Sequence, residues 1–328
     1  MIDRAIPMRW LALDAVRATD AIVDAIRSGV QQTLRRRGAV IGLSGGIDSS
    51  VVTALAARAL GSDRTVAVLM PERESSADSL TLARELTEQL GVEAIVEDIT
   101  ALLQAAGCYR RRDDAIRSVI PEYGPDHRSK IVLSQLGDGA YRVFYVVAQR
   151  PDGTQVRARL TPEAYLAVVA ATNFKQRTRK MLEYFHADRL NYAVMGTPNR
   201  LEYDQGFFVK NGDGAADVKP IAHLYKTQVY QLAEHLGLPE AIRARPPTTD
   251  TYSLSQSQEE FYFSLPYDKM DACLYARNHG LDPAEVCRAT GLSREQVEGA
   301  YRDIDAKRKA TRYLHLDPLL VEPIREIM

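Results

Sequence analysis

Apolar residues follow two alternating spacings over the first hundred positions. Short apolar runs, typical of buried strands, alternate with segments whose apolar residues recur every three or four positions, as in helices packed on a sheet. The runs that predict strands are 40–43, 65–70 and 92–99, and the segments that predict helices are 14–37, 49–60 and 76–90. This order predicts an α/β fold, a doubly wound parallel sheet with helices on both faces, which binds ligands at the carboxyl ends of its strands.

The pattern is interrupted between residues 108 and 165. This stretch is rich in charged residues and is predicted to be irregular except for 141–160. There, alternating apolar residues flank the turn Pro151-Asp152-Gly153 and predict a β-hairpin. A hairpin between the helices of a parallel sheet indicates an insertion. Its residue types suggest packing or contact with a partner.

The α/β pattern returns after the insertion. A basic segment at 172–181 is predicted to open a helix, and a strand at 192–195 and a helix at 224–236 follow. We therefore expect a single domain over residues 1–328, with the insertion inside it and a C-terminal helical segment.

Composition limits the partners and the compartment. Lys and Arg number 42 against 43 Asp and Glu, so the net charge is −1 and no nucleic-acid partner is expected. The segment 282–297 has the cadence of a helix-turn-helix, but Glu295 and Glu298 favour helix packing over DNA binding. The three cysteines form no CxxC, which is typical of a reducing compartment. With no signal-peptide pattern and no apolar stretch of about 18 residues, we expect a cytoplasmic protein without a membrane partner.

The strongest functional signal lies at residues 40–50. A strand is predicted to lead into the small-residue turn Ser44-Gly45-Gly46 and then into a helix. Such a turn forms an anion site, because backbone N–H groups point outward and the helix dipole favours negative charge. Neighbouring serine hydroxyls add donors, and Asp48 offers a carboxylate for Mg²⁺ on a phosphate. The endings of a Walker loop and of a Rossmann GxGxxG are both missing.

Two further segments predict ligand contacts. Residues 206–217 are too rich in glycine and charge for regular structure, which favours an ordered binding loop. Lys226 falls in the first turn of its predicted helix, where a cation opposes the helix dipole. It is therefore better placed to meet an anion than to stabilise the helix.

The turn matches Ser-Gly-Gly-x-Asp-Ser, the pyrophosphate loop of the N-type ATP pyrophosphatases. Nearly the whole chain outside 108–165 resembles the NAD synthases of this superfamily. The motifs are Asn-x-Lys-x-Arg-Thr-Arg at 173–179, Gly-Thr at 196–197 with Glu202 five residues after the Thr, Gly-Phe-Phe-x-Lys-x-Gly-Asp-Gly-x-x-Asp at 206–217, Pro-Thr-x-Asp at 247–250 and Tyr-Asp-x-x-Asp at 267–271. The resemblance implies ATP-dependent amidation of nicotinic acid adenine dinucleotide (deamido-NAD). The substrate carboxylate attacks the α-phosphorus, pyrophosphate leaves, and ammonia displaces AMP from the acyl-adenylate.

The resemblance also implies which residues bind. ATP would contact Gly42, Leu43, Ser44, Gly45, Gly46, Ile47, Asp48, Ser49, Thr197, Lys226 and Thr248. Deamido-NAD would be held by Arg177, Lys210, Asp217 and Lys307. Mg²⁺ would be shared by Asp48 and Glu202, and the catalytic residues would be Asp48, Lys226 and Thr197. The chain departs from the family at Pro198-Asn199-Arg200, where relatives often have Asp-His and a small residue, and it lacks the His that often precedes the basic pair at 307–308.

Assembly and nitrogen source are expectations of the same kind. The resemblance implies a homodimer that binds the dinucleotide across its interface. An apolar stripe on the N-terminal helix fits such an interface, with packing on the subunit's own sheet as the alternative; its residues are Leu13, Val16, Ile22, Val23, Ile26 and Val30. Because the α/β ligase takes up most of the chain, a fused glutaminase is not expected. The expected donor is ammonia, free or delivered by a separate glutaminase.

Other functions stay open. An amide-forming ATP pyrophosphatase acting on another carboxylate is the nearest alternative. A tRNA-thiolating relative would need paired cysteines and a basic face. A non-catalytic adenine-nucleotide sensor could keep the phosphate loop but has little need for Asp48, Glu202 and Lys226 together.

Overall fold

A four-stranded parallel sheet lies at the centre of the fold. The computed structural model describes residues 9–133, 143–246, 252–254, 262–263, 265–324 and 326. The strand order is β3-β2-β1-β7, with β1 at Ala39–Gly42, β2 at Thr65–Leu69, β3 at Glu93–Val96 and β7 at Ala193–Met195. The chain moves outward from β1 to β3 and then returns to the other side of β1 as β7. The topological switch point, where such sheets bind ligands, therefore lies between β1 and β7.

Helices cover both faces of this sheet. One face carries α1 (Ala15–Ser28), α2 (Ile47–Leu60), α3 (Ala77–Leu90), α8 (Lys226–His235) and α9 (Glu240–Ala244), and the other carries α4 (Thr100–Ala105), α5 (Cys108–Arg117) and α6 (Pro162–Leu190). In β1, Ala39 and Ile41 pack into the first core and Val40 into the second, as strand periodicity requires. The predicted doubly wound α/β fold is confirmed.

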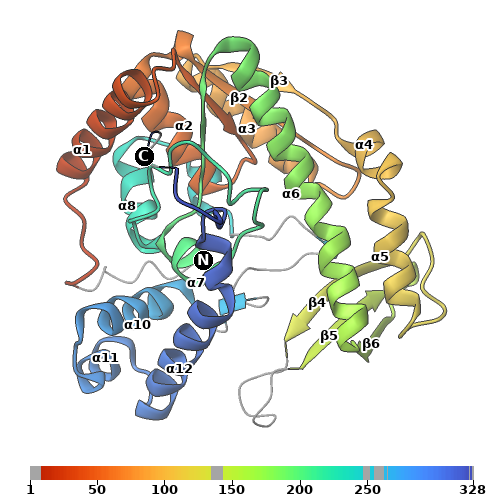
Figure 1. The fold of residues 1–328 in the computed structure, drawn as a ribbon. Helices are drawn as coiled ribbons and strands as arrows, with labels where there is room; N and C mark the ends of the chain where they lie inside the picture. Colours follow the sequence, from red (N-terminus) through yellow and green to blue (C-terminus); the bar gives the residue numbers. More distant parts are fainter. Residues whose placement is uncertain are drawn as a thin grey trace.

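Helix α6 begins ten residues before the predicted position. Thr161 is its N-cap, with Oγ1 accepting the Ala164 N–H at 3.1 Å, and Pro162 is its first residue. The prediction that 172–181 opens a helix is therefore wrong, since that segment lies within a helix of 29 residues. Thr-Pro-Glu at 161–163 carries the start signal. Figure 1 shows α6 running from the parallel sheet to a second, smaller sheet.

The stretch 108–165 is more regular than predicted. The hairpin is confirmed as β5 (Phe144–Gln149) paired antiparallel with β6 (Gln155–Arg159), but β4 (Arg128–Leu133) adds a third strand and α5 a helix. Helix α5 escapes sequence reasoning because an arginine, Arg112, is among the few residues that it buries.

Helices α10 (Tyr267–His279), α11 (Pro283–Thr290) and α12 (Arg294–Thr311) form the C-terminal helical segment. They share an apolar cluster that also takes in Leu201 of α7 (Arg200–Gln205). Val286 of α11 and Val297 and Ile304 of α12 are buried in it, so the helix-turn-helix cadence reflects helix packing. A 3₁₀ turn (Arg312–His315) follows α12. No helix among the described residues is both long and apolar enough to cross a membrane.

The stripe on α1 packs within the subunit. Ile22, Val23 and Ile26, with Val30 in the π-helical turn Gly29–Thr33, lie in the chain's own core, whereas Val16 is 60% exposed. The expectation that this stripe forms a subunit interface is wrong. Its spacing is that of any helix covering a sheet, and spacing alone does not distinguish the two uses.

Candidate active site

The loop between β1 and α2 has the geometry of an anion site. Gly46 is the extended N-cap of α2, so the first N–H groups of the helix lack acceptors within it. The hydroxyls of Ser49 and Ser50 both donate to the Gly46 carbonyl, at 3.1 and 2.8 Å, and Ser49 Oγ accepts the Ser44 N–H at 3.3 Å. These serines brace the loop. The donors for an anion are the N–H groups of the first turn of α2.

Gly45 is dictated by its surroundings. Its φ is +74°, a conformation that L side chains rarely adopt, and a Cβ there would overlap the carbonyl oxygen of Ser79 in α3. At Gly42, the last residue of β1, the only tight neighbours are side chains, since a Cβ would stand 2.6 Å from Oε1 of Glu183.

Three predicted site residues meet beside this loop. Asp48 lies in the first turn of α2, Glu202 in the first turn of α7, and Lys226 begins α8. Lys226 Nζ forms an ion pair with one carboxylate oxygen of Asp48, and Asn199 Nδ2 donates to the other at 3.1 Å. Asn199 also shares a capping box with Glu202, whose Oε2 accepts the Asn199 N–H at 3.2 Å. Residues that follow β1 and β7 thus converge at the switch point.

Burial sets the electrostatics of this cluster. Lys226 is 1% exposed; burial opposes its charge, but Asp48 and Glu202 outweigh that effect and raise its pKa. Burial, reinforced by the charge of Asp48, raises the pKa of Glu202 to about 8. Within the described part of the chain, no three His, Cys, Asp or Glu side chains gather as metal ligands. A metal at Asp48 and Glu202 would therefore need further oxygens from a bound phosphate.

Helix α10 fixes the start of α8. Asp271 accepts the backbone N–H groups of Lys226 and Thr227, at 3.3 and 2.7 Å, and burial raises its pKa to about 7. Tyr267, one turn earlier on α10, places its ring 5.5 Å from Lys226 Nζ. The Tyr-Asp-x-x-Asp motif thus holds the lysine at its backbone and at its ammonium.

A cavity of about 550 Å³ opens at these groups. Nine residues of the predicted ATP set line it: Gly42, Leu43, Ser44, Gly46, Ile47, Asp48, Ser49, Thr197 and Lys226. Gly45 does not line the cavity but faces Ser79 of α3, and Thr248 lies outside the described residues. Glu202 and Lys307 also line the cavity; Lys307 Nζ donates to the Tyr262 carbonyl at 2.6 Å and pairs with Asp303 at 2.9 Å.

The remaining residues predicted for deamido-NAD lie apart from the cavity lining. Arg177 is exposed and donates from Nε to the Lys210 carbonyl at 3.3 Å, while Lys210 Nζ donates to the carbonyls of Tyr313 and Leu316. Asp217 accepts the Val194 N–H at 2.8 Å, at the end of the sheet. Arg177 and Lys210 thus contact each other outside the cavity lining, and Asp217 stands apart from that lining beside β7.

The cavity also contains an ion pair that sequence reasoning missed. Lys180 Nζ and Glu183 Oε2 of α6 are 2.6 Å apart, and both side chains are buried in the cavity wall. The signal was available in helical spacing, because α6 lines the cavity with Thr172, Gln176 and Arg179 as well as this pair. A helix start at 172 leaves out only Tyr165 and Val169, which line the cavity from the first part of α6.

Comparison with known proteins identifies the family. The sequence pattern of the NAD synthase family matches residues 18–118 and 152–313. The chain belongs to the NAD synthase family. An NH3-dependent NAD+ synthetase of Rhizobium meliloti is 61% identical over 97% of this chain and 95% of its own length, and one of Rhizobium rhizogenes is 58% identical over 98% of each. The predicted family, enzyme class and ammonia-dependent activity are those of these relatives.

Solved structures of NAD synthase type share the fold. The NH3-dependent NAD synthetase of Campylobacter jejuni superimposes with a TM-score of 0.63 at 23% identity, covering 94% of this chain and all of that one. An NMN synthetase of Francisella tularensis gives a TM-score of 0.65 at 22% identity, covering 94% and 99%.

The phosphate loop yields a prediction for Gly45→Ala. The added methyl group forces a positive φ on alanine and collides with the backbone of α3, so we expect ATP-dependent pyrophosphate release to fall by at least about tenfold. The matched control is Gly153→Ala in the β5–β6 turn, where φ is +86° but no atom lies within 4 Å of the added Cβ. That change should cost about 1 kcal/mol of stability and leave activity intact. Equal activity loss in both variants, measured beside thermal melting, contradicts the assignment.

Proposed function

We propose that the chain makes NAD from deamido-NAD, ATP and ammonia through an acyl-adenylate, with the cavity at the β1–β7 switch point as its active site. The convergence of Asp48, Glu202 and Lys226 on the phosphate loop carries the proposal. A loop for pyrophosphate, a buried cation and two acids suit nucleotidyl transfer, which needs positioning and charge neutralisation and no covalent nucleophile.

Each group has a role in the first step. The N–H groups that open α2 bind the β- and γ-phosphates, and Lys226 neutralises charge on the departing pyrophosphate. Asp48 holds Lys226 in place, and Asn199 orients Asp48 through its 3.1 Å hydrogen bond. Thr197, at the end of β7, lies on the cavity wall where its hydroxyl can donate to the α-phosphate.

The acid pair fits Mg²⁺. The donors are hard carboxylate oxygens, and desolvation together with the charge of Asp48 raises the pKa of Glu202 to about 8. A dication held by these acids would offset their mutual repulsion, and with ATP it would supply charge neutralisation at the phosphates. Asp48 and Glu202 would hold it together with phosphate oxygens.

The identity of the substrate rests on the relatives. Proteins up to 61% identical over nearly the full chain are named NH3-dependent NAD+ synthetases, whereas the NMN synthetase is 22% identical and supports the fold alone. This favours the dinucleotide over the mononucleotide.

We also propose a homodimer, now placed on α6. Met181 and Phe185 follow Arg177 at successive turns of that helix and are 55% and 56% exposed. A second subunit covering these side chains would also meet Arg177, which stands outside its own cavity. This arrangement would let Arg177 serve the partner's substrate.

The first prediction concerns products. Purified protein given ATP, deamido-NAD and ammonium should release AMP, pyrophosphate and NAD in equal amounts, and glutamine should not replace ammonium. Nicotinic acid mononucleotide in place of deamido-NAD should react with a much lower kcat/KM. ATP binding without turnover would instead support a nucleotide sensor, and a preference for another carboxylate would support a different amide-forming ligase.

The second prediction concerns pH. Below its pKa of about 8, Glu202 must lose a proton before it binds a metal, so the apparent affinity for Mg²⁺ should rise with pH and level off above 8. The rise should approach tenfold per unit. Glu202→Gln removes the titrating carboxyl group, so the apparent Mg²⁺ affinity should be weaker and should change less with pH. Magnesium titrations of pyrophosphate release at fixed ATP test this, and superimposable profiles for the two proteins would reject the ligand role of Glu202.

The third prediction concerns assembly. Asp48→Asn and Arg177→Ala are each expected to be inactive, but mixed dimers contain one site with both residues intact. Mixing under subunit exchange should restore up to about half of wild-type activity per hybrid. A monomer by sedimentation, or hybrids without activity, would refute the shared site.

A further inference from the structure

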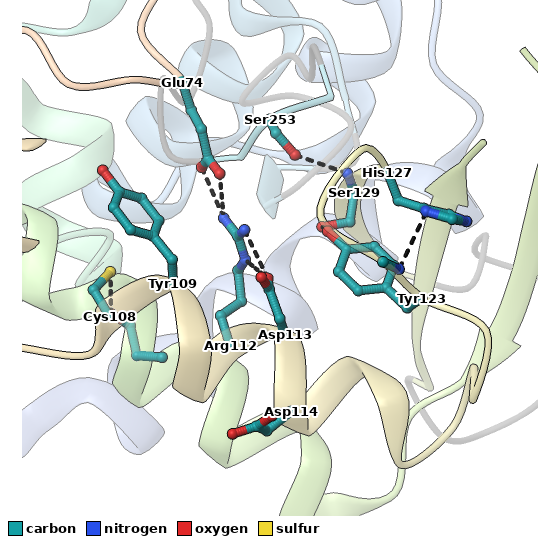
Figure 2. A network of polar contacts seen from close by, with 12 residues as sticks. Glu74, Cys108, Tyr109, Arg112, Asp113, Asp114, Tyr123, His127, Ser129 and Ser253 are labelled. Carbon is teal, nitrogen blue, oxygen red and sulfur yellow. Dashed lines mark hydrogen bonds and ion pairs between the residues drawn. The ribbon is translucent and has the colours of Figure 1, made fainter. Parts of the chain in front are cut away.

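A network of buried charges joins α5 and α6 to the loop that follows β2. In this loop, 71–76, the residues Pro71, Ser75 and Ser76 line the nucleotide cavity. Glu72 and Glu74 lie between these residues in the chain, and their side chains contact α5 and α6. Figure 2 shows Arg112 extending from α5 to Glu74.

Each acid of the loop is held from both helices, and Glu74 also lies 3.6 Å from Nη2 of Arg73. Glu72 accepts hydrogen bonds from Lys175 Nζ at 2.8 Å and from the Tyr109 hydroxyl at 2.7 Å. Glu74 accepts one from Lys175 Nζ at 2.7 Å, and both its oxygens lie 2.7 Å from Nη1 of Arg112. One lysine of α6 therefore bridges both acids, and α5 holds each of them a second time.

Packing and charge reinforce these bonds. Lys175 is 1% and Arg112 3% exposed, so both cations lie in the interior. Arg73 stacks on the Tyr109 ring with Cζ 3.6 Å from its centroid. Burial opposes the ionisation of Glu74, but Lys175 and Arg112 outweigh it and lower the pKa of this acid. Lys175 and Arg112 thus place two buried cations against the two acids of the loop.

The same part of the chain reaches a second loop at the cavity. The Ser129 N–H in β4 donates to Ser253 Oγ at 2.9 Å, and the Leu254 N–H donates to the Ser129 carbonyl at 3.1 Å (Figure 2). Tyr252, beside them, lines the cavity. The segment 108–133 therefore forms hydrogen bonds with two segments that line the cavity, 71–76 and 252–254.

We propose that Arg112, Tyr109 and Lys175 are positioning residues of the nucleotide site, and that the segment 108–133 serves to hold the cavity loops in their ATP-binding shape. The proposal rests on the function proposed above, since it assigns the cavity to ATP. None of the three side chains lines the cavity, so each acts through the loop.

Two physical arguments favour this role. Buried ion pairs add little net stability compared with apolar side chains of the same size, but they select one conformation, because a displaced acid would lose its partners in the interior. In addition, Glu72 and Glu74 would repel a polyphosphate if they were unpaired next to its cavity. The network both fixes the loop and neutralises it.

The test neutralises the Arg112–Glu74 pair and leaves Asp113, the second acid paired with Arg112, with its side chain 15% exposed to water. In Arg112→Met/Glu74→Gln both partners become neutral at similar volume, and Lys175 keeps Glu72. Arg112→Lys keeps the charge but puts a single ammonium in place of the guanidinium, which contacts Glu74 through Nη1 and Asp113 through Nε and Nη2. It decides the case if the double variant does not fold. The control is Arg150→Gln, which breaks the exposed Arg150–Glu122 pair elsewhere in the insertion, 3.0 Å long.

Two readouts are measured on the full chain. In unliganded protein, amide hydrogen exchange of peptide 70–76 should accelerate by about tenfold in the double variant, while that of 39–46 stays unchanged. In turnover, KM for ATP should rise by at least about fivefold in the double variant, with kcat and KM for deamido-NAD near wild type. The KM for ATP of Arg112→Lys should lie between those of wild type and the double variant. Arg150→Gln should match wild type in both readouts.

The outcomes separate this proposal from the proposed function. Uniformly faster exchange across the protein would mean a purely structural network, and unchanged KM for ATP in a variant with a loosened loop would mean that the loop does not position the nucleotide. Either result overturns the proposal while wild-type chemistry stands. If the wild-type chain forms no AMP, the proposed function fails, whatever the exchange data show.

Discussion

The buried charge of Lys226 is the constraint on which the site depends. An ammonium group removed from water must be paired, and here its partner, Asp48, comes from a different element of the fold. The pair can form only if the helix after β1 and the helix α8 begin at the same point. Asn199, which follows β7, completes the arrangement by binding Asp48 and capping α7. The parallel sheet thus serves to bring three helix N-termini together.

Outer elements hold this centre from two sides. On one side α10 fixes the first turn of α8 through Asp271 and places Tyr267 beside Lys226. On the other, the network around Lys175 and Arg112 holds the loop after β2. Neither element belongs to the four-stranded sheet. The additions to the basic α/β unit therefore have a role that follows from their contacts, namely to fix loops that the sheet alone leaves at its edge.

Elements with a periodic apolar pattern are predicted from the sequence, whereas features that depend on one buried polar residue or one tertiary contact are not. The strands and most helices follow from periodicity, and the phosphate loop from the small residues that its turn requires. Helix α5 was missed because it buries Arg112, and the long reach of α6 because basic residues concealed the start signal at Thr161. The stripe of α1 predicts an interface but packs in the chain's own core, because periodicity identifies a buried face and not what covers it.

The candidate site divides in the same way. Residues adjacent to a recognisable turn, such as Asp48, fall where a motif predicts them. Helical spacing places Lys180 and Glu183 on one face of α6 with Thr172, but it does not show that this face lines the cavity, which depends on how α6 crosses the sheet. Arg177, Lys210 and Asp217 follow the motif in sequence, yet they lie outside the cavity of their own subunit. In the proposed homodimer, a second chain would bring a substrate to Arg177, and helical spacing alone does not indicate such a contact.

The central claim is that the cavity joins a substrate carboxylate to the α-phosphorus of ATP. The most direct measurement uses deamido-NAD labelled with ¹⁸O in its nicotinate carboxylate, with mass analysis of the products formed in the presence of ammonium. Attack on the α-phosphorus followed by amide formation transfers one labelled oxygen to AMP and none to pyrophosphate. Label found in inorganic phosphate with ADP as the second product, or AMP without label, would contradict the account.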